Sequence, residues 1–261
     1  MRRITLLIVL ALILTSVAPA LAQEGPTGTF YAAWPYPLPP DGHLNSFATG
    51  GPGQGAGIGL YWRWVELPLA FYLAADASYE GWLAESWEFE GDDAFVVRLR
   101  QDAVWSDGTP ITADDVVGTY AIGRILKWSE FNYVSAVEKV DDFTIRFALS
   151  NPSLVAQHLI LRSPIRSMVT YGDLAQKALD LIASGAEVDG EEWSALQTEI
   201  LEFRPESIIA SGPFIYTLDD VGDSFMTLHW QPNSIFSDTV QFGEVRIWYG
   251  ETEAVTPLVL D

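Results

Sequence analysis

The stretch that decides the fold runs from Leu83 to Val117 and reads LAESWEFEGDDAFVVRLRQDAVWSDGTPITADDVV. Apolar and polar residues alternate over 87–89 and again over 95–100, on either side of a Gly-Asp-Asp turn cluster at 91–93. Alternation with a period of two on both sides of turn-forming residues is typical of antiparallel strands joined by a tight turn. We therefore predict a β-hairpin with one buried face here.

The second half of this stretch predicts the start of a helix. After a turn over 105–110, the hydroxyl of Thr112 can cap a helix N-terminus. The carboxylates of Asp114 and Asp115 follow in the first turn, where the positive end of the helix dipole favours anions. We expect the helix to extend to about Lys127, which places a cation near its C-terminus.

Similar patterns continue along the chain. They predict a second hairpin over 137–140 and 144–149, helices over 152–161, 173–184 and 190–203, and strands over 214–218, 225–230 and 244–249. Residues 24–59 are rich in glycine and proline, so we expect an ordered loop there rather than a strand or a helix. Strands and helices interleave without strict alternation, which predicts a mixed α/β fold.

The first 22 residues have the pattern of a secretory signal peptide. Arg2 and Arg3 precede an apolar run over 4–14, and Ala20-Leu21-Ala22 supplies a small-x-small cleavage site. The chain has no cysteine to carry a lipid after that site. We predict an exported protein, periplasmic or otherwise outside the cytoplasmic membrane, that is not a lipoprotein.

Composition excludes several classes of function. The chain has 35 acidic against 14 basic side chains and a formal net charge of −21, so we expect no nucleic-acid partner, which would require a basic patch. The absence of cysteine excludes a thiolate zinc site, a thiol nucleophile and disulfides. His43, His158 and His229 are not spaced as a helical metal pair, so we expect no metal site.

No catalytic signature stands out. Gly-x-Ser-x-Gly and Ser-x-x-Lys motifs are absent, and the acidic pairs occupy predicted turns or helix starts, where aspartate acts as a cap or turn former. Gly51-x-Gly53-x-x-Ala56 loosely fits a dinucleotide fingerprint but follows a proline-rich loop rather than a strand, so we expect no cofactor. We predict that the protein is not an enzyme. A secreted carbohydrate-active enzyme, built on a carboxylate pair that the sequence does not single out, stays open as an alternative.

Aromatic residues in and just after the glycine- and proline-rich region are candidates for ligand contact. Aromatic residues at strand spacing are usually core, whereas these lack periodicity and suit flat platforms that stack on sugar rings or line a peptide slot. Asn45 and Glu66 are the nearest polar partners. Together with the motif matches given next, this nominates the following ligand-binding residues: Trp34, Tyr36, Asn45, Phe47, Trp64 and Glu66.

The stretch from 83 to 117 resembles a signature of the family-five extracellular solute-binding proteins, the receptors of ATP-binding-cassette importers for oligopeptides, dipeptides, nickel and oligosaccharides. The shared pattern is Leu-Ala-Glu-Ser-Trp at 83–87, a hairpin, and Trp-x-Asp-Gly-x-Pro-x-Thr-Ala-x-Asp-Val-Val at 105–117. Ser46 replaces the family's usual proline, and Leu67 alters the segment around Glu66. Shorter similar segments lie at 43–47, 64–69, 211–214 and 244–247, so the resemblance covers most of residues 28–255.

The resemblance implies a periplasmic-binding-protein-like α/β fold of the large two-lobed type II class, in which hinge closure holds the ligand. Family members are usually much longer, so we expect an N-terminal fragment: an incomplete first lobe over 23–261, with a peripheral subdomain at roughly 66–205 and without the second lobe.

In function, the resemblance implies a monomeric receptor that captures a solute and delivers it to the membrane permease subunits of an importer. Peptide and oligosaccharide ligands stay open at this point, whereas nickel is disfavoured because no histidine lies in a suitable cradle. A surface-binding protein without a role in transport is a further alternative.

Overall fold

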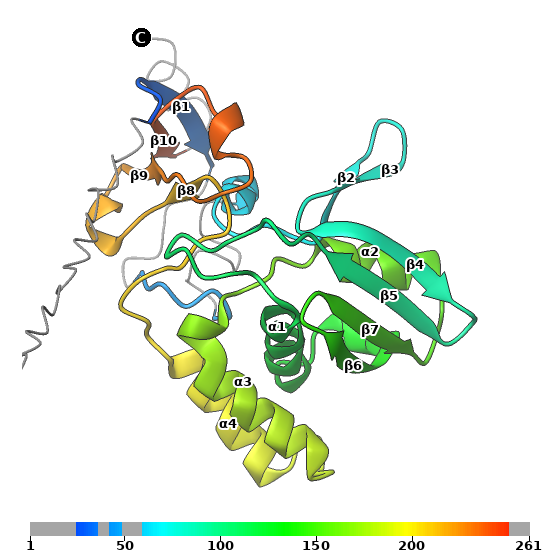
Figure 1. Ribbon diagram of the computed structural model, residues 1–261. Coiled ribbons are helices and arrows are strands. Elements are labelled where there is room, and N and C mark those ends of the chain that lie inside the picture. The colour runs from blue at the N-terminus through cyan, green and yellow to red at the C-terminus, as the bar shows by residue number, and fades with distance from the viewer. Residues whose placement is uncertain (1–24, 36–41, 49–58, 251–261) are drawn as a thin grey trace, which may run out of the picture.

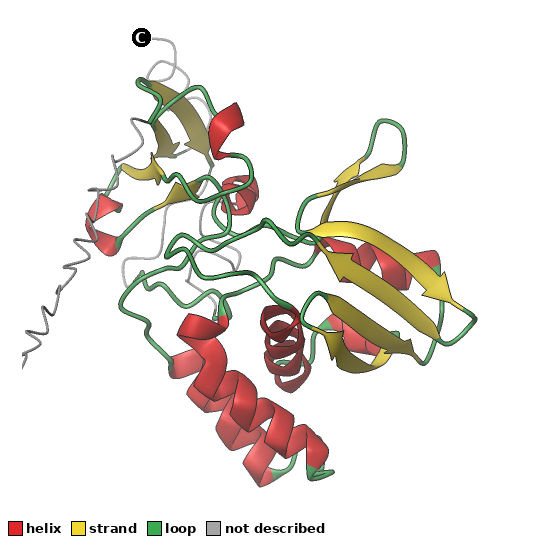
Figure 2. Cartoon of the chain, viewed as in Figure 1, coloured by secondary structure: helices red, strands yellow, loops and turns green. Residues whose placement is uncertain are grey.

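The computed structural model describes residues 25–35, 42–48 and 59–250, which form two four-stranded sheets, a separate hairpin and four α-helices (Figures 1 and 2). The smaller sheet has the strand order β1-β10-β9-β8, in which β1 and β10 are parallel and the other neighbours are antiparallel. Its strands are β1 (Thr29–Trp34), β8 (Phe214–Ile215), β9 (Phe225–Trp230) and β10 (Glu244–Tyr249).

The larger sheet is antiparallel throughout, in the order β4-β5-β7-β6. Its strands are β4 (Ala84–Glu90), β5 (Ala94–Leu99), β6 (Val134–Asp141) and β7 (Thr144–Leu149), and a hairpin of β2 (Ala70–Leu73) and β3 (Ser78–Gly81) projects beside it (Figure 1). Both predicted hairpins are therefore confirmed. The mixed α/β fold class is confirmed as well.

Of the four helices, one lies behind the larger sheet and three lie beside and below it in the view of Figure 1. The helices are α1 (Ala113–Ile125), α2 (Leu154–Arg162), α3 (Met168–Ala183) and α4 (Glu191–Glu202). Helix α1 packs between the larger sheet and α3, and α4 runs alongside α3 (Figure 1). In the described part of the chain, no helix has both the length and the apolar character needed to span a membrane.

The predicted cap of α1 also anchors a second helix. The backbone N–H of Thr112 donates to the Asp115 carboxylate at 2.9 Å, as in a capping box. The other oxygen of Asp115 accepts from the backbone N–H of Met168 at 2.9 Å, so one buried carboxylate joins the N-termini of α1 and α3. Burial raises the pKa of Asp115, and the hydrogen bonds from Met168 and Thr112 lower it.

Strand β5 is buried on both faces rather than on one. Phe95 and Val97 are fully buried in the core, and Val96 on the opposite face is only 8 % exposed. Val96 pairs with Glu88 on one side and Arg146 on the other, and the aliphatic parts of such long side chains cover apolar neighbours. The alternation expected from the sequence appears more clearly in β7.

Two expectations from local sequence need correction. Residues 29–34 form a strand, not a loop, because they pair with β10 more than 200 positions away, a partner that local composition does not reveal. Helix α3 begins at Met168 rather than at 173, since the Ser167 hydroxyl accepts from the Val169 N–H and caps it there. The proposed signal peptide, Tyr36 and the glycine fingerprint at 51–56 lie outside the described residues.

Candidate functional site

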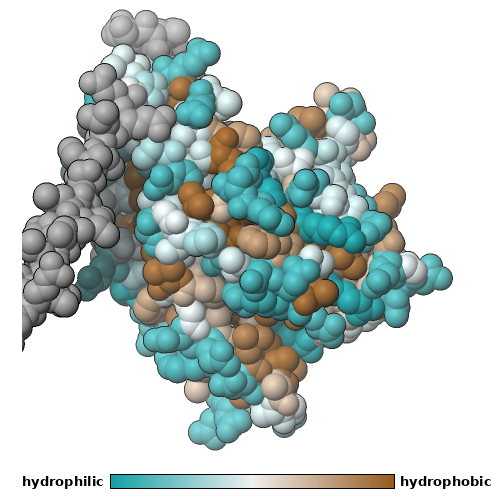
Figure 3. Space-filling model, viewed as in Figure 1, coloured by the Kyte–Doolittle hydropathy of each residue, from teal (hydrophilic) through white to brown (hydrophobic). Residues whose placement is uncertain are grey.

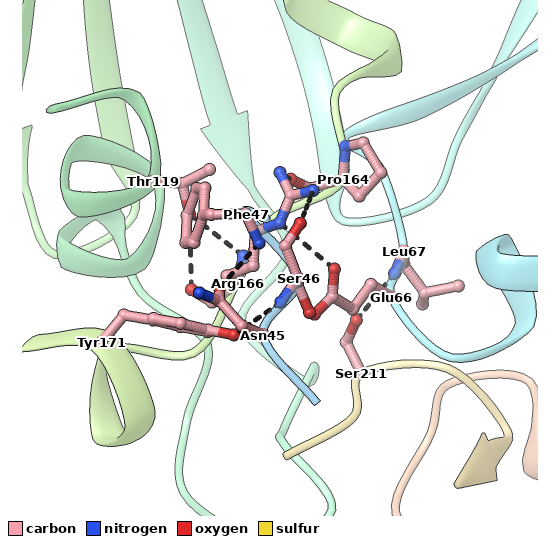
Figure 4. A network of polar contacts seen from close by, with 10 residues as sticks. All are labelled: Asn45, Ser46, Phe47, Glu66, Leu67, Thr119, Pro164, Arg166, Tyr171 and Ser211. Atoms are coloured by element: carbon pink, nitrogen blue, oxygen red, sulfur yellow. Dashed lines mark hydrogen bonds and ion pairs between the residues drawn. The ribbon is translucent and has the colours of Figure 1, made fainter. Parts of the chain in front are cut away.

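A buried polar network joins the short segment 42–48 to Glu66, Arg166 and Tyr171 (Figure 4). At its centre, Glu66 Oε2 lies 3.2 Å from Arg166 Nε, and each of these two side chains is only 3 % exposed. Glu66 Oε1 also accepts a hydrogen bond from the Ser46 hydroxyl at 2.7 Å. We call Asn45, Ser46, Glu66, Arg166 and Tyr171 the Glu66 network.

The Glu66 carboxylate is in an unusual electrostatic environment. Burial raises its pKa to about 7, although the guanidinium of Arg166 and the hydroxyl of Ser46 act in the opposite direction. Arg166 in turn donates to the carbonyls of Pro164 and Ser46, at 2.9 and 3.3 Å. Its guanidinium stacks against Phe47, with Cζ 4.7 Å from the ring centroid.

Asn45 fixes the same segment to the end of helix α4. Its side-chain amide donates to the carbonyls of Ile200 and Phe203, at 2.7 and 3.0 Å, and its Oδ1 accepts from the Phe47 N–H at 2.9 Å. The last carbonyls of a helix have no partner within the helix, so Asn45 satisfies groups that would otherwise be buried unpaired. The Ser46 N–H donates to the Tyr171 hydroxyl at 2.9 Å, which adds a contact to α3.

The segment around Gly212 packs directly on the chain that carries Glu66. The backbone N–H groups of Ser211 and Gly212 both donate to the Val65 carbonyl, and Ser211 Oγ accepts from the Leu67 N–H at 2.8 Å. A Cβ atom at position 212 would lie 2.1 Å from the Trp64 carbonyl oxygen, so only glycine allows this approach. These contacts hold segment 211–214, one of the family-like segments, directly against residues 64–67.

Beside this junction lies an apolar groove of about 380 Å³, which we call the aromatic groove. Trp82 stands against Phe236 at a ring-centroid distance of 5.1 Å, and Phe214 stacks on Phe242 at 5.6 Å. Arg63 is the charged residue of the lining. The lining residues are Arg63, Trp64, Leu67, Trp82, Pro213, Phe214, Phe236, Thr239, Val240, Gln241 and Phe242.

The lining of the groove is mostly apolar. On the face drawn in Figure 3, hydrophilic side chains predominate and apolar ones form separate patches among them. An apolar concavity with few polar groups is the usual form of a small-molecule site, and flat aromatic walls suit sugar rings or apolar side chains. Within the described part of the chain, no group of three or more histidine, aspartate or glutamate side chains could hold a metal ion.

The structure separates the six predicted ligand-binding residues. Asn45, Phe47 and Glu66 are buried in or against the Glu66 network, where each has partners within the protein. Trp64 lines the aromatic groove, and Trp34 ends strand β1 beside the core of the smaller sheet. Tyr36 lies outside the described residues.

Sequence reasoning missed most of the groove. Arg63 and Trp82 flank segments that had been singled out, at 64–69 and 83–87, so their position next to the motifs is a signal that could have found them. Phe236 and Phe242 carry no such signal. They reach the groove because the smaller sheet brings the connection between β9 and β10 back to residues 63–67.

Comparison with protein families gives one match that spans most of the chain. The sequence model of the bacterial extracellular solute-binding proteins, family 5, matches residues 78–256. The periplasmic oligopeptide-binding protein OppA of Escherichia coli is 23 % identical over 150 residues, which cover 47 % of this chain and 27 % of OppA. The peptidoglycan-binding protein YepA of Agrobacterium fabrum is 35 % identical over 91 residues, 33 % of this chain and 15 % of YepA. The chain therefore spans less than a third of the length of these relatives.

Solved structures show the same fold. A periplasmic oligopeptide-binding protein of Thermotoga maritima with bound mannohexaose superposes with a TM-score of 0.64 and 21 % identity, covering 91 % of this chain and 40 % of that protein. The oligopeptide-binding protein AppA of Bacillus subtilis in complex with a nonapeptide gives a TM-score of 0.59 and 17 % identity, covering 86 % and 40 %. The periplasmic-binding-protein-like, type II fold predicted from the sequence is thereby confirmed.

Proposed function

Because this chain belongs to family 5 of the bacterial extracellular solute-binding proteins, we propose that it is part of a receptor that captures an oligopeptide or an oligosaccharide and delivers it to an ATP-binding-cassette importer. The family match over residues 78–256 carries this proposal. The matched relatives are much longer than this chain, so capture is proposed for the protein that contains it. Delivery would require contact with the permease subunits in the membrane.

The location and state of the protein form part of the same proposal. The signal-peptide pattern over 1–22 favours export to the periplasm or another space outside the cytoplasmic membrane, without a lipid anchor. We propose a monomer that has no nucleic-acid partner and catalyses no reaction on its ligand. The excess of acidic side chains supports the exclusion of nucleic acid.

The hydrophobic cores of the two sheets are separate, which supports a division of the described chain into two parts; a third core lies among α1, α3 and α4. One core lies under the smaller sheet and includes Trp62, Phe214 and Val245, and another lies under the larger sheet and includes Phe95 and Phe147. This arrangement is consistent with a first lobe that carries a peripheral subdomain at roughly 66–205. In the full-length protein, we propose that a second lobe closes over ligand held against the first.

Ligand-dependent stabilisation tests the function. The complete protein, expressed from its gene, is heated with a panel of short peptides and a panel of oligosaccharides, with free nucleotides as a control. A ligand that binds only the folded state adds about 2.7 kcal/mol to stability at one hundred times its Kd, so one panel is expected to raise Tm by several degrees.

Two results would contradict the proposal. A folded protein whose Tm no member of either panel moves would exclude capture of these solutes. Release of reducing sugars from a polysaccharide, with initial rates proportional to protein concentration, would instead identify the carbohydrate-active enzyme.

A further inference from the structure

Arg63 and Arg162 are two cations that form no ion pair with the described residues of a strongly acidic protein. The formal net charge is −21, yet the ion pairs of the described chain leave both of these guanidinium groups without a carboxylate. Arg63 stacks over the ring of Phe71 with its Cζ at 5.5 Å, and it lines the aromatic groove. Arg162 lies outside that lining, so Arg63 is the charged residue of the groove, and no carboxylate of the described chain lies within ion-pair distance of it.

The two arginines also repel each other. Partial burial lowers the pKa of Arg63, and the positive charge of Arg162 lowers it further. Both effects disfavour the charged form of Arg63 in the absence of a ligand. An anion bound at Arg63 would offset the repulsion from Arg162, because it would supply the missing counter-charge.

The neighbouring histidine does not provide that charge. Arg162 contacts His158 Nε2 at 2.6 Å, and because arginine can only donate, Nε2 accepts. The proton of a neutral imidazole then lies on Nδ1, which donates to the Tyr79 hydroxyl at 2.6 Å. His158 is therefore a neutral support that orients Arg162, and partial burial together with Arg162 lowers its pKa.

The groove that Arg63 lines has a definite chemistry. Phe71, on which Arg63 stacks, itself stacks on Trp82 at 4.8 Å with the two rings nearly parallel, and Trp82 contacts Phe236. A row of aromatic rings therefore extends from the Arg63 guanidinium along the groove. A volume of about 380 Å³ lies at the small end of ligand sites and suits one terminal residue rather than a whole oligopeptide.

We propose that the aromatic groove binds the C-terminal residue of a short peptide, with the terminal carboxylate at Arg63 and an apolar side chain against Trp82 and Phe236. This assignment rests on the proposed solute-binding function and narrows it to peptides. A neutral sugar could stack on the aromatic walls, but it would leave the positive charge at the groove uncompensated. A carboxylate attached to an apolar group satisfies both features at once.

The test changes the ligand first. Isothermal titration of the complete protein uses the tetrapeptide Ala-Ala-Ala-Phe with a free carboxylate, its C-terminal amide, and Ala-Ala-Ala-Ser. A hydrogen bond to a charged group is worth about 1.5–3 kcal/mol, so the amide is expected to bind at least about tenfold more weakly than the free acid. The serine peptide is expected to lose affinity as well, because it cannot fill the apolar wall.

Two matched variants then locate the effect. Arg63→Gln should bind the free acid and the amide with equal affinity, at the level of the amide in the wild type. Arg124→Gln is the control, because Arg124 likewise stacks on a phenylalanine, Phe131, at 5.5 Å but does not line the groove. It should keep the preference for the acid.

The outcomes separate this proposal from the function on which it rests. Equal binding of acid and amide by the wild type, or an unchanged acid preference in Arg63→Gln, overturns the groove assignment and leaves peptide capture standing. Failure of the wild type to bind any of the peptides, with binding of oligosaccharides instead, overturns the peptide reading as a whole.

Discussion

The side chains of two arginines, Arg166 and Arg63, lie in opposite environments. Arg166 is buried against Glu66, donates to two backbone carbonyls and stacks on aromatic rings. Arg63 is half-exposed at a groove, stacks on one ring and has no carboxylate partner among the described residues. A buried arginine with a carboxylate partner stabilises the fold. A half-exposed arginine without such a partner is available to bind an anionic ligand.

The Glu66 network should therefore be the part that stability depends on most. Above pH 7, where Glu66 is ionised in the wild type, replacing Arg166 with methionine leaves the Glu66 carboxylate buried without its counter-charge, which typically costs about 3–5 kcal/mol. We expect a loss of about that size in the free energy of unfolding, measured from urea denaturation midpoints. The double variant Glu66→Gln with Arg166→Met should recover part of it, because the orphaned charge is gone.

An exposed pair provides the control for that loss. Arg98 and Glu88 also form an ion pair, at 2.8 Å, but their side chains are 49 % and 59 % exposed. Arg98→Met should cost less than about 1 kcal/mol, since exposed pairs contribute little. Equal losses for the two methionine variants would show that burial of the Glu66 network has no special energetic role.

The protonation of Glu66 gives a second, slightly smaller effect. Its pKa is raised from 4.5 to about 7 in the folded protein, so between these values the folded state holds a proton that the unfolded state has released. Stability must then fall as pH rises through this window, by about 3 kcal/mol in total. Glu66→Gln removes this contribution, so the stability of the variant relative to wild type should increase between pH 4.5 and pH 7.

Urea denaturation of both proteins at half-unit steps of pH measures that difference directly. Other titrating groups contribute to each curve but cancel in the difference between them. Curves that stay parallel from pH 4 to pH 8 would mean that Glu66 is ionised with its ordinary affinity for protons, and that the network is less sealed than its 3 % exposure indicates.

The sequence predicted those parts of the molecule whose causes are local. The hairpin of β4 and β5 and the cap at Thr112 follow from alternation and from residue types within a few positions. Strand β1 did not, because its partner β10 lies far along the chain and its own composition resembles that of a loop. Long-range pairing overrides weak local preference in such strands.

The same limit applies to the candidate site. The sequence nominated Asn45 and Glu66 as ligand-binding residues because they are the polar residues nearest the aromatic ones. It could not show that Asn45 has buried partners on α4 and that Glu66 has buried partners in Ser46 and Arg166. The aromatic groove combines residues from 63–67, 82, 213–214 and 236–242, and only the fold brings these segments together. The residue type shows that a polar group occurs at a position, but only its partners in the fold show whether its role is structural or ligand-binding.

The stability of the protein without ligand should depend little on Arg63. Without ligand, Arg63→Gln should change the free energy of unfolding by no more than about 0.5 kcal/mol, because stacking on Phe71 is offset by partial desolvation and by repulsion from Arg162. Arg124→Gln loses a stacking contact at the same 5.5 Å and also a hydrogen bond to the Ser135 carbonyl, so it should cost more, about 1 kcal/mol. Urea midpoints measured in one buffer give both values. A loss for Arg63→Gln as large as that for Arg166→Met would show that Arg63 has a structural role. The distinction between a buried, paired arginine and one available to a ligand would then no longer hold.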